Sequence, residues 1–515
     1  MISRRTMLGA TAGGVGAALL PQTTTALATT ASGAAAGTPT AAAWDQLAGK
    51  LAGRLVLPAD AGYEVAKQLE LAQFDVIRPQ AVAYCTSSAD VSKAVCFAQE
   101  QGVPVAVRSG GHNYAGASTG PGLVIDVSEI KAINVGPSTV TLGPGSLNID
   151  VLNALAAKGV ALSSGGCPTV ATGGFLQGGG LSFMTRTLGV GCDSVRSAQV
   201  VLANGSTVTA SANRNSDLYW AIRGGGGGNF GIITSYELTH HVVGPLLVSY
   251  LFFPYERAAE IMDASTRWLV DAPRSISGGV YITLPDAAPG AVPDTAITLV
   301  SRGTSAELAA ETARLLAMTG QPVGRQDMTT SYRDLMVNIF GCGSLSQDAC
   351  RRSEKSPTGV LPRPAFGVER MRMVTDPLPA AGWSQVMAAF DAHRATGQRR
   401  TLEVHWFGGA ANDIAESATA YPHRDTLYCV SYRSTIADTA QATAAGKAVS
   451  QAWVNGGFAA VDPYSNGGTY VNYMDPALPD WKRSYYGDNY ARLLTVKKKY
   501  DPKRFFNFPQ SVGAA

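Results

Sequence analysis

The sequence predicts an α+β protein in which an antiparallel sheet is covered by helices on one face. In its second half, strand-like runs alternate with runs of helical spacing. Strands are expected at 247–253, 278–283 and 296–301, and helices at 258–270 and 305–318. In its first half, short apolar runs lead into glycine-rich loops. The 57 glycines show no collagen-like period, which indicates a backbone that closely approaches a large ligand.

Composition narrows the class of partner. Only 15% of the 515 residues are charged and the formal net charge is +3. This balance predicts no nucleic-acid partner and no polyanionic substrate. The seven cysteines show no spacing typical of metal ligands, so no metal is expected. Their odd number leaves at least one outside any intramolecular disulfide, and Cys342 and Cys350 are a candidate pair.

The N-terminus has the pattern of an export signal. Arg4 and Arg5 precede an apolar stretch that reaches Leu20, and the small residues of 26–28 fit a cleavage site. We expect residues 1–28 to be a twin-arginine signal peptide that the bacterial export machinery recognises through Arg4-Arg5. An ordinary secretory signal is the alternative. The apolar stretch is too short for a confident transmembrane helix, so we expect an extracellular protein with no stable membrane association after cleavage.

The next elements can be assigned in order. Residues 29–42 read as a flexible leader and 43–55 as a short helix. A helix is expected at 90–101, with Asp90 as its cap and Gly102 as its stop. Strands are expected at 103–107, 122–126 and 140–143, and a helix at 149–158. Asn204-Gly205 predicts a hairpin between strands at 193–203 and 206–210. Residues 342–364, rich in Ser, Pro and charge, read as a mobile loop.

Two glycine-rich loops carry nucleophilic side chains. The loop 108–116 follows a strand and places several backbone N–H groups on one concave surface, an arrangement that binds phosphate. It contains His112, and the loop that follows residue 162 contains Cys167. Two such side chains, each on its own loop, suit a cofactor anchored at two points. Residues 173–180 do not fit a dinucleotide fingerprint, because Gly178, Gly179 and Gly180 are consecutive and no βαβ unit follows.

These motifs also resemble a known family. Matching pieces are 108–116, 167–180, 218–233, 421–424, 470–473 and the ending from 485 to 511. In this order they resemble the FAD-linked oxidases of the berberine-bridge-enzyme type, within the vanillyl-alcohol-oxidase superfamily. The resemblance covers nearly all of the chain after about residue 74. Its character is nearest to the branch of aclacinomycin oxidoreductase and the tirandamycin-type tailoring oxidases.

The resemblance implies an architecture and a cofactor. The fold would be a two-part PCMH-type FAD-binding domain at 43–246, a substrate-binding domain at 247–463 and a C-terminal segment, 464–515, that completes the FAD domain. FAD would be bicovalent, with its 8α-methyl bonded to His112 and its C6 bonded to Cys167. The other implied cofactor-binding residues are Arg108, Ser109, Gly110, Gly111, Asn113, Tyr114, Gly116, Gly173, Gly174, Gly178, Gly179, Gly180, Gly231, Ile232, Ile233, Asn472 and Tyr473.

Two catalytic candidates follow. The resemblance places Tyr470 near the substrate, but a phenol with an ordinary pKa of about 10 acts as a base only if its surroundings lower that value. Glu403 occupies a position that faces the flavin in relatives and is the second acid/base candidate. His405 shares its face of the strand by period-two alternation. Plant relatives that oxidise simple alcohols carry a tyrosine where this chain has Leu181, which favours a bulkier, less polar substrate.

The function that follows is an exported flavoprotein oxidase. We expect a small-molecule alcohol as substrate, a hydroxyl of a polyketide or other secondary metabolite that becomes a ketone. Hydride would pass to flavin N5, and molecular oxygen would reoxidise the flavin to give hydrogen peroxide. A carbohydrate oxidase that forms a lactone and an oxidative cyclase are alternatives on the same scaffold. A non-catalytic exported flavin-binding protein is the alternative from another class.

Overall fold

The computed structural model describes residues 37–514. The expected signal peptide, with its Arg4-Arg5 pair, and most of the expected leader lie outside these residues. Within them, no helix has the length and apolar character needed to cross a membrane.

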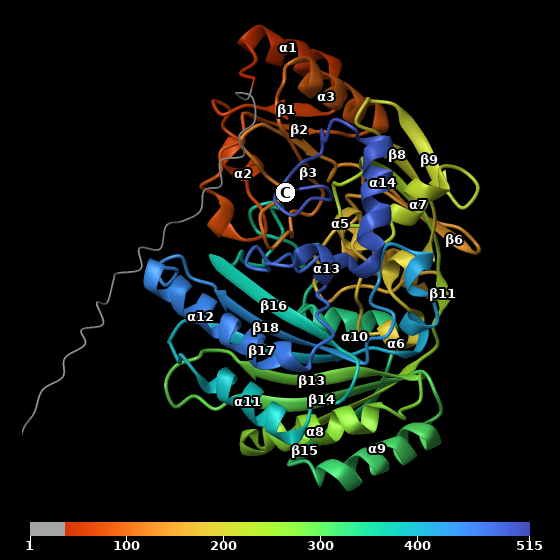
Figure 1. Cartoon of the computed structure of the whole chain (residues 1–515), viewed down its shortest axis with the longest axis vertical. Coiled ribbons are helices and arrows are strands. Elements are labelled where there is room, and N and C mark those ends of the chain that lie inside the picture. The colour runs from red at the N-terminus through yellow and green to blue at the C-terminus, as the bar shows by residue number, and fades with distance from the viewer. Residues whose placement is uncertain (1–36, 515) are drawn as a thin grey trace, which may run out of the picture. The chain divides into compact units, whose positions relative to one another are not determined.

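Two sheets build the part of the molecule that carries the glycine-rich loops (Figure 1). The first has the strand order β1 (Arg54–Val56), β2 (Ala81–Tyr84), β4 (Leu123–Asp126) and β3 (Val105–Arg108). The second has the order β5 (Ile133–Val135), β6 (Thr139–Leu142), β10 (Ile232–Thr239), β8 (Val195–Val201) and β9 (Thr207–Ser211). In the first sheet β4 pairs in parallel with both β2 and β3, whereas all pairs in the second are antiparallel. A small antiparallel pair joins β7 (Val160–Ala161) and β11 (His241–Val242).

A seven-stranded antiparallel sheet forms the other main layer. Its order is β15 (Gly324–Thr330), β12 (Leu246–Phe253), β14 (Asp294–Ser301), β13 (Ile276–Leu284), β17 (Arg399–Trp406), β18 (Tyr428–Ile436) and β16 (Phe366–Val374). Four helices cover one face: α8 (Ala258–Leu269), α9 (Ser305–Thr319), α11 (Ala380–Asp391) and α12 (Ala444–Val461). Trp268, Trp383 and Trp453 are fully buried between these helices and the strands.

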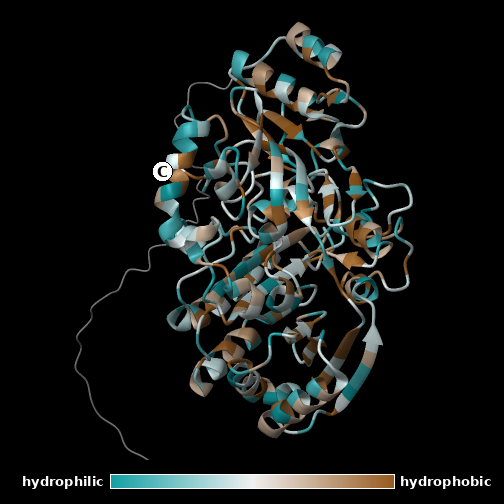
Figure 2. Ribbon diagram, turned by 90° about the vertical axis from the view of Figure 1, so that its right-hand side faces the viewer, coloured by the Kyte–Doolittle hydropathy of each residue, from teal (hydrophilic) through white to brown (hydrophobic). Residues whose placement is uncertain are grey.

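Alternation along the strands decides what each face of this sheet does. Val280, Ile282, Leu402, Val404 and Val430 point into the core beneath the helices. Because successive side chains of a strand point to opposite faces, the residues between them must point to the other side. The face that the helices leave uncovered therefore carries the intervening, more polar residues. Figure 2 shows the resulting distribution, with hydrophobic strands inside and hydrophilic stretches on the outer helices.

The remaining helices connect the sheets or pack at their edges. They are α1 (Ala41–Lys50), α2 (Tyr63–Ala66), α3 (Ser88–Glu100), α4 (Asn148–Ala156), α5 (Thr172–Gln177), α6 (Thr185–Leu188), α7 (Ser216–Ala221), α10 (Tyr332–Ile339), α13 (Trp481–Tyr486) and α14 (Tyr490–Tyr500).

The chain returns to the first half at its end. Residues of α13 and α14 share one core with β8 and β10. The Lys497 ammonium donates to the carbonyls of Asn229 and Phe506, at 2.6 Å each, and pairs with Asp501 at 2.8 Å. This buried cation fixes the C-terminal segment against the loop before β10.

The α+β class and the PCMH-type architecture are confirmed, and so is the hairpin, since β8 and β9 pair with Val201 opposite Thr207. Two local expectations are wrong. The helix expected over 43–55 ends at Lys50, and the chain enters β1. Ser87 rather than Asp90 caps α3; the Asp90 carboxylate instead accepts N–H bonds from Ala52 and Gly53, which anchors the chain before β1. The domain boundaries stay predictions.

The segment 342–364 contains no α-helix and no strand, as expected, but it is extensively tied down. Cys342 and Cys350 form a disulfide, which confirms the candidate pair. Arg351 binds the carboxylate of Asp150 on α4, and Arg363 binds that of Asp75. The segment is therefore fastened to the first half of the chain at several points.

Candidate active site

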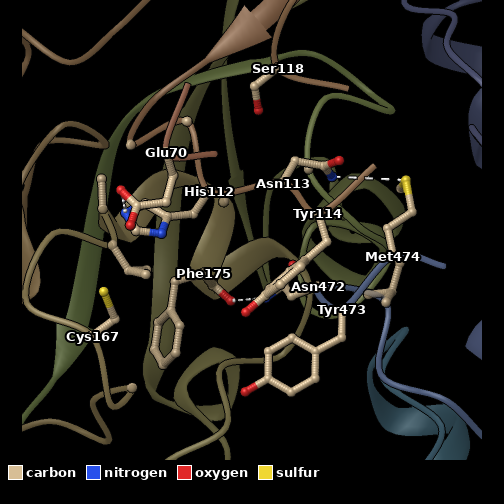
Figure 3. A pocket seen from close by; sticks show the side chains of 18 of the residues that line it. Glu70, His112, Asn113, Tyr114, Ser118, Cys167, Phe175, Asn472, Tyr473 and Met474 are labelled. Atoms are coloured by element: carbon tan, nitrogen blue, oxygen red, sulfur yellow. Dashed lines mark hydrogen bonds and ion pairs between the residues drawn. The ribbon is translucent and has the colours of Figure 1, made fainter. Parts of the chain in front are cut away.

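A cavity of about 630 Å³ lies between the glycine-rich loops and the uncovered face of the seven-stranded sheet. Figure 3 shows part of its lining, with His112, Asn113 and Tyr114 on one loop and Asn472, Tyr473 and Met474 on the C-terminal segment. Segments distant in sequence thus meet here. Of the predicted site residues, those that line it are Ser109, Gly110, Gly111, His112, Asn113, Tyr114, Cys167, Gly173, Gly174, Ile232, Ile233, Glu403, Tyr470, Asn472 and Tyr473.

The two proposed anchors lie close together because both approach the same hydroxyl group. His112 Nε2 is 3.1 Å from Thr169 Oγ1, and Cys167 Sγ is 3.5 Å from the same atom. Asn148 holds the second loop by donating from Nδ2 to the Cys167 carbonyl, at 2.9 Å. Both side chains therefore line the same part of the cavity.

The imidazole of His112 is held neutral. Burial, and secondarily the Lys355 ammonium, lower the pKa of His112 to about 4. The ring therefore carries no charge at neutral pH, and a neutral imidazole keeps one nitrogen lone pair available as a nucleophile.

Glycines let the backbone form the cavity wall. Part of the wall is formed by the backbone of Gly226, Gly227 and Gly228. The φ angles of Gly226 and Gly228 are +83° and +72°, which residues other than glycine rarely adopt. A Cβ atom on Gly110 would lie 2.8 Å from the Ala171 amide nitrogen, so the two cavity loops can approach each other only with glycine at this position.

Six predicted cofactor-binding residues do not line the cavity. Arg108 is buried in the first sheet, where Nε donates to Asp126 at 2.5 Å. Gly116 turns the loop beside the Phe74 ring, and Gly231 packs against Val200. These positions shape the fold around the site, and the structure gives them no contact with the cavity.

The other three of the six are the consecutive glycines Gly178, Gly179 and Gly180. Because they have no side chains, Tyr470 and its neighbours can pack against their backbone. A Cβ atom on Gly178 would lie 2.1 Å from Asn472 Oδ1, and one on Gly179 would lie 2.7 Å from the Tyr421 ring. Gly180 donates its N–H to the Tyr470 hydroxyl at 2.8 Å. These glycines therefore make room for side chains of the site, and their expected role in binding the cofactor stays a prediction.

The hydroxyl oxygen of Tyr470 accepts three hydrogen bonds. The donors are the N–H groups of Gly180 and Leu181 and the amide of Asn472, at 2.8, 3.2 and 2.7 Å. Burial nevertheless raises the pKa of Tyr470 above that of a free phenol. The group is thus held in place and kept protonated.

Glu403 shows the opposite behaviour. Burial favours its protonated form, but the hydrogen bond and charge of His405, together with the charge of Arg433, outweigh burial and lower the pKa of Glu403 below 4.5. His405 Nδ1 lies 3.5 Å from Glu403 Oε1. Among the predicted catalytic groups, Glu403 is the one that is ionised at neutral pH.

The uncovered sheet face forms a polar wall. Strands β13, β17 and β18 contribute alternate residues to it: Tyr281, Thr283, Arg399, Thr401, Glu403, His405, Cys429, Ser431, Arg433 and Thr435. The apolar residues Leu181, Phe183 and Phe175 also line the cavity, and the Phe183 ring stacks against Tyr281 of this wall, with centroids 5.8 Å apart. The cavity therefore offers both polar and apolar contacts.

Two buried polar atoms at the wall lack a partner within residues 37–514. The Tyr281 hydroxyl and His405 Nε2 make no hydrogen bond there. Unpaired buried polar groups cost free energy, so native sites satisfy them with a ligand or water. Together with the glycine loops and the neutral His112 beside Cys167, these atoms fit a large cofactor and a polar substrate, as FAD and an alcohol would be.

Sequence reasoning missed four residues of this site: Glu70, Thr169, Tyr281 and Arg433. Thr169 lies in the glycine-rich loop of Cys167, whereas the other three are outside the glycine-rich loops. Alternation along residues 428–436 could have placed Arg433 on the face of Ser431, whereas nothing local marks Glu70. No cluster of His, Cys, Asp or Glu among the described residues could hold a metal ion.

Comparison with known proteins supports this interpretation. Residues 79–211 match the family described as FAD binding domain, and residues 469–513 match the family described as berberine and berberine like. The uncharacterized FAD-linked oxidoreductase YgaK of Bacillus subtilis (strain 168) is 26% identical over 90% of this chain and 97% of its own.

A second relative and a solved structure cover similar lengths. The xylooligosaccharide oxidase of Thermothelomyces thermophilus is 29% identical over 85% of this chain and 88% of its own. The structure of BBE-like 1 from Physcomitrella patens superimposes with a TM-score of 0.79, at 26% identity, over 91% of this chain and 98% of that one. The chain therefore carries an FAD-binding domain and a berberine-like C-terminal segment, it is similar over most of its length to oxidases of the berberine-bridge-enzyme-like type, and it is an FAD-dependent oxidoreductase.

Proposed function

We propose that this FAD-dependent oxidoreductase is an oxidase with bicovalent FAD, attached at His112 and Cys167, that oxidises a hydroxyl of a small molecule. One observation carries the proposal. The neutral imidazole of His112 and the Cys167 sulfur both contact the Thr169 hydroxyl, at a cavity whose sheet wall presents the ionised Glu403. The two proposed flavin anchors and the proposed base therefore line the same cavity.

Glu403 is the general base in this proposal. A base must be deprotonated at the working pH, and the pKa of Glu403 is lowered whereas that of Tyr470 is raised. Glu403 takes the hydroxyl proton, and His405 holds the carboxylate in place. Tyr470, fixed by three donors, presents its hydroxyl hydrogen as a donor to the substrate or the cofactor.

FAD held by His112 and Cys167 would supply the acceptor for the carbinol hydride, with oxygen as the final electron acceptor and hydrogen peroxide as the product. The cavity residues position the substrate carbon. Leu181 and Phe183 exclude water, and the polar groups of the sheet wall bind substrate hydroxyls.

Two substrate classes follow from the two kinds of lining residue. The first is a secondary-metabolite alcohol, which the apolar residues Leu181, Phe183 and Phe175 would accept. The second is an oligosaccharide oxidised to a lactone, which the polar wall favours, since the unpaired Tyr281 hydroxyl and His405 Nε2 can bond sugar hydroxyls. A relative named xylooligosaccharide oxidase is consistent with the second class.

Acid precipitation and a substrate panel test the function. Yellow colour in the acid pellet, with peroxide release on an alcohol or sugar, is the expected result. The panel should contain oligosaccharides and hydroxylated polyketides, because each substrate class predicts that its own members give the fastest peroxide release. A colourless pellet would refute covalent attachment, and a coloured protein that releases no peroxide on any of them would refute the oxidase.

We also propose that the chain is exported by the twin-arginine route, on the strength of Arg4-Arg5 and the pattern of residues 1–28. Flavin attachment before export suits a route that carries folded proteins. Replacing both arginines by lysine should retain the protein inside a bacterial host. Unchanged secretion of that variant would favour the ordinary secretory route.

A further inference from the structure

Glu70 places a carboxylate beside the proposed anchor His112. Its Oε2 lies 3.5 Å from His112 Nε2, and Figure 3 shows the two side chains side by side at the edge of the cavity. The Glu70 backbone N–H also donates to the carbonyl of Gly111, the residue before His112, at 3.0 Å. The side chains of Glu70 and His112 are only 12% and 18% exposed. The contact is thus fixed by the backbone as well as by the side chains.

Arg352 holds the carboxylate in this position. Its Nε donates to Glu70 Oε2 at 2.9 Å, and its Nη2 pairs with the other carboxylate oxygen. Arg352 stands two residues after Cys350, in the disulfide-tied segment 342–364. A two-point contact of this kind orients a carboxylate strongly. Glu70 therefore cannot turn away from His112 without breaking the pair.

The arrangement decides the state of the imidazole. An ionised carboxylate only accepts hydrogen bonds, so it favours a proton on Nε2, where the Thr169 hydroxyl is also in reach. A neutral ring with its proton on Nε2 has an unprotonated Nδ1. The carboxylate thus selects one tautomer and one ring orientation, as second partners of metal-bound histidines do.

We propose that Glu70, fixed by Arg352, is a positioning residue that orients His112 for covalent attachment of the flavin. This rests on the proposed function, namely on attachment at His112. In attachment, a C–N bond forms between the imidazole and the 8α carbon, while one 8α C–H bond and one imidazole N–H bond break. Both hydrogens, and with them two electrons, pass to the flavin ring, and dioxygen removes them as hydrogen peroxide.

The test separates the two anchors. In a Cys167→Ala background only His112 can retain flavin, and in a His112→Ala background only Cys167 can. Flavin-free protein from riboflavin-limited cells is mixed with FAD, and the rate of covalent attachment is followed by intact mass and by flavin fluorescence in denaturing gels. Glu70→Gln should slow attachment in the first background by roughly 10- to 100-fold, the range for partners that orient a histidine. Glu70→Asp should restore part of the rate.

Asp75→Asn is the matched control. Asp75 pairs with Arg363 at 2.8 Å, so it joins the same two segments but does not contact His112 in the structure. Its attachment rate should equal that of the parent. In the His112→Ala background Glu70→Gln should leave attachment at Cys167 unchanged.

Three results would overturn the proposal: an unchanged rate in the Cys167→Ala background, an equal loss in Asp75→Asn, or an equal loss at Cys167. The last two would show a purely structural role. Failure of the proposed function is distinguishable, because the Cys167→Ala parent would then carry no covalent flavin at all, which would overturn both.

Discussion

Replacing Glu403 by Gln tests the assignment of the base. Gln has the same shape and keeps an acceptor oxygen, but it cannot take the substrate proton. The structure makes the carboxylate the ionised candidate, because His405 and Arg433 together lower its pKa despite its burial. We expect the variant to fold, bind flavin and lose catalysis.

The size of the loss follows from the role. General base catalysis contributes roughly 10²- to 10⁴-fold, which is about 3 to 5 kcal/mol of activation free energy. The pH profile adds a second signature. The active form of Glu403 is deprotonated and its pKa is lowered, so the wild-type rate should be level at neutral pH and fall only at a pH below the range in which an ordinary carboxyl group titrates. The Gln variant should lack this step.

The assay is the rate of flavin reduction under anaerobic conditions, with the substrate that gives the most peroxide. It reports the chemical step without the oxygen reaction. Glu369→Gln is a control of the same chemical change, because burial raises the pKa of Glu369 and the Gln amide resembles the protonated acid. If Glu403→Gln reduced the flavin at the wild-type rate while Tyr470→Phe lost the activity, the assignment of the base would be wrong.

Three further predictions concern stability, measured as the free energy of unfolding in urea. Gly179→Ala should lose at least about 2 kcal/mol, because φ is +125° and the new Cβ would lie 2.7 Å from the Tyr421 ring. Asp193→Ala should lose about 3 to 5 kcal/mol, because it leaves the guanidinium of Arg424, whose side chain is 2% exposed, buried without its carboxylate at 2.7 and 2.8 Å. Cys342→Ser should lose about 2 to 3 kcal/mol, because opening the disulfide to Cys350, eight residues away, enlarges the entropy of the unfolded chain.

Each stability prediction has a control in the same chain. Gly49→Ala lies in α1 with open space around its Cβ position, so it should be neutral or stabilising. Asp413→Ala removes an exposed partner of Arg274 and should cost at most about 1 kcal/mol. Cys96→Ser removes a free thiol. Equal losses in a variant and its control would contradict the local explanation.

Some features were predictable because their signals are local. The Asn204-Gly205 turn, the amphipathic helices after residue 257 and the loops that carry His112 and Cys167 depend on neighbouring residues alone. Local reasoning failed where a distant partner changed a residue's role. Asp90 looked like a helix cap, but the backbone of Ala52 and Gly53 uses its carboxylate. The run Gly178 to Gly180 predicts a cofactor cradle, but nothing local predicts that Asn472 lies against Gly178 and Tyr421 against Gly179.

The sequence by itself determined the α+β class, the glycine loops with their two nucleophiles, and the FAD-linked chemistry that the family motifs imply. Only the tertiary structure decided which groups meet: Tyr470 with Gly180, 290 residues apart, and Glu70 with Arg352, 282 residues apart. It also decided the ionisation of Glu403 and Tyr470, since burial and neighbouring charges set a pKa. The physical reason is that turn and helix preferences act over a few residues, whereas packing brings together residues whose spacing in the sequence carries no signal.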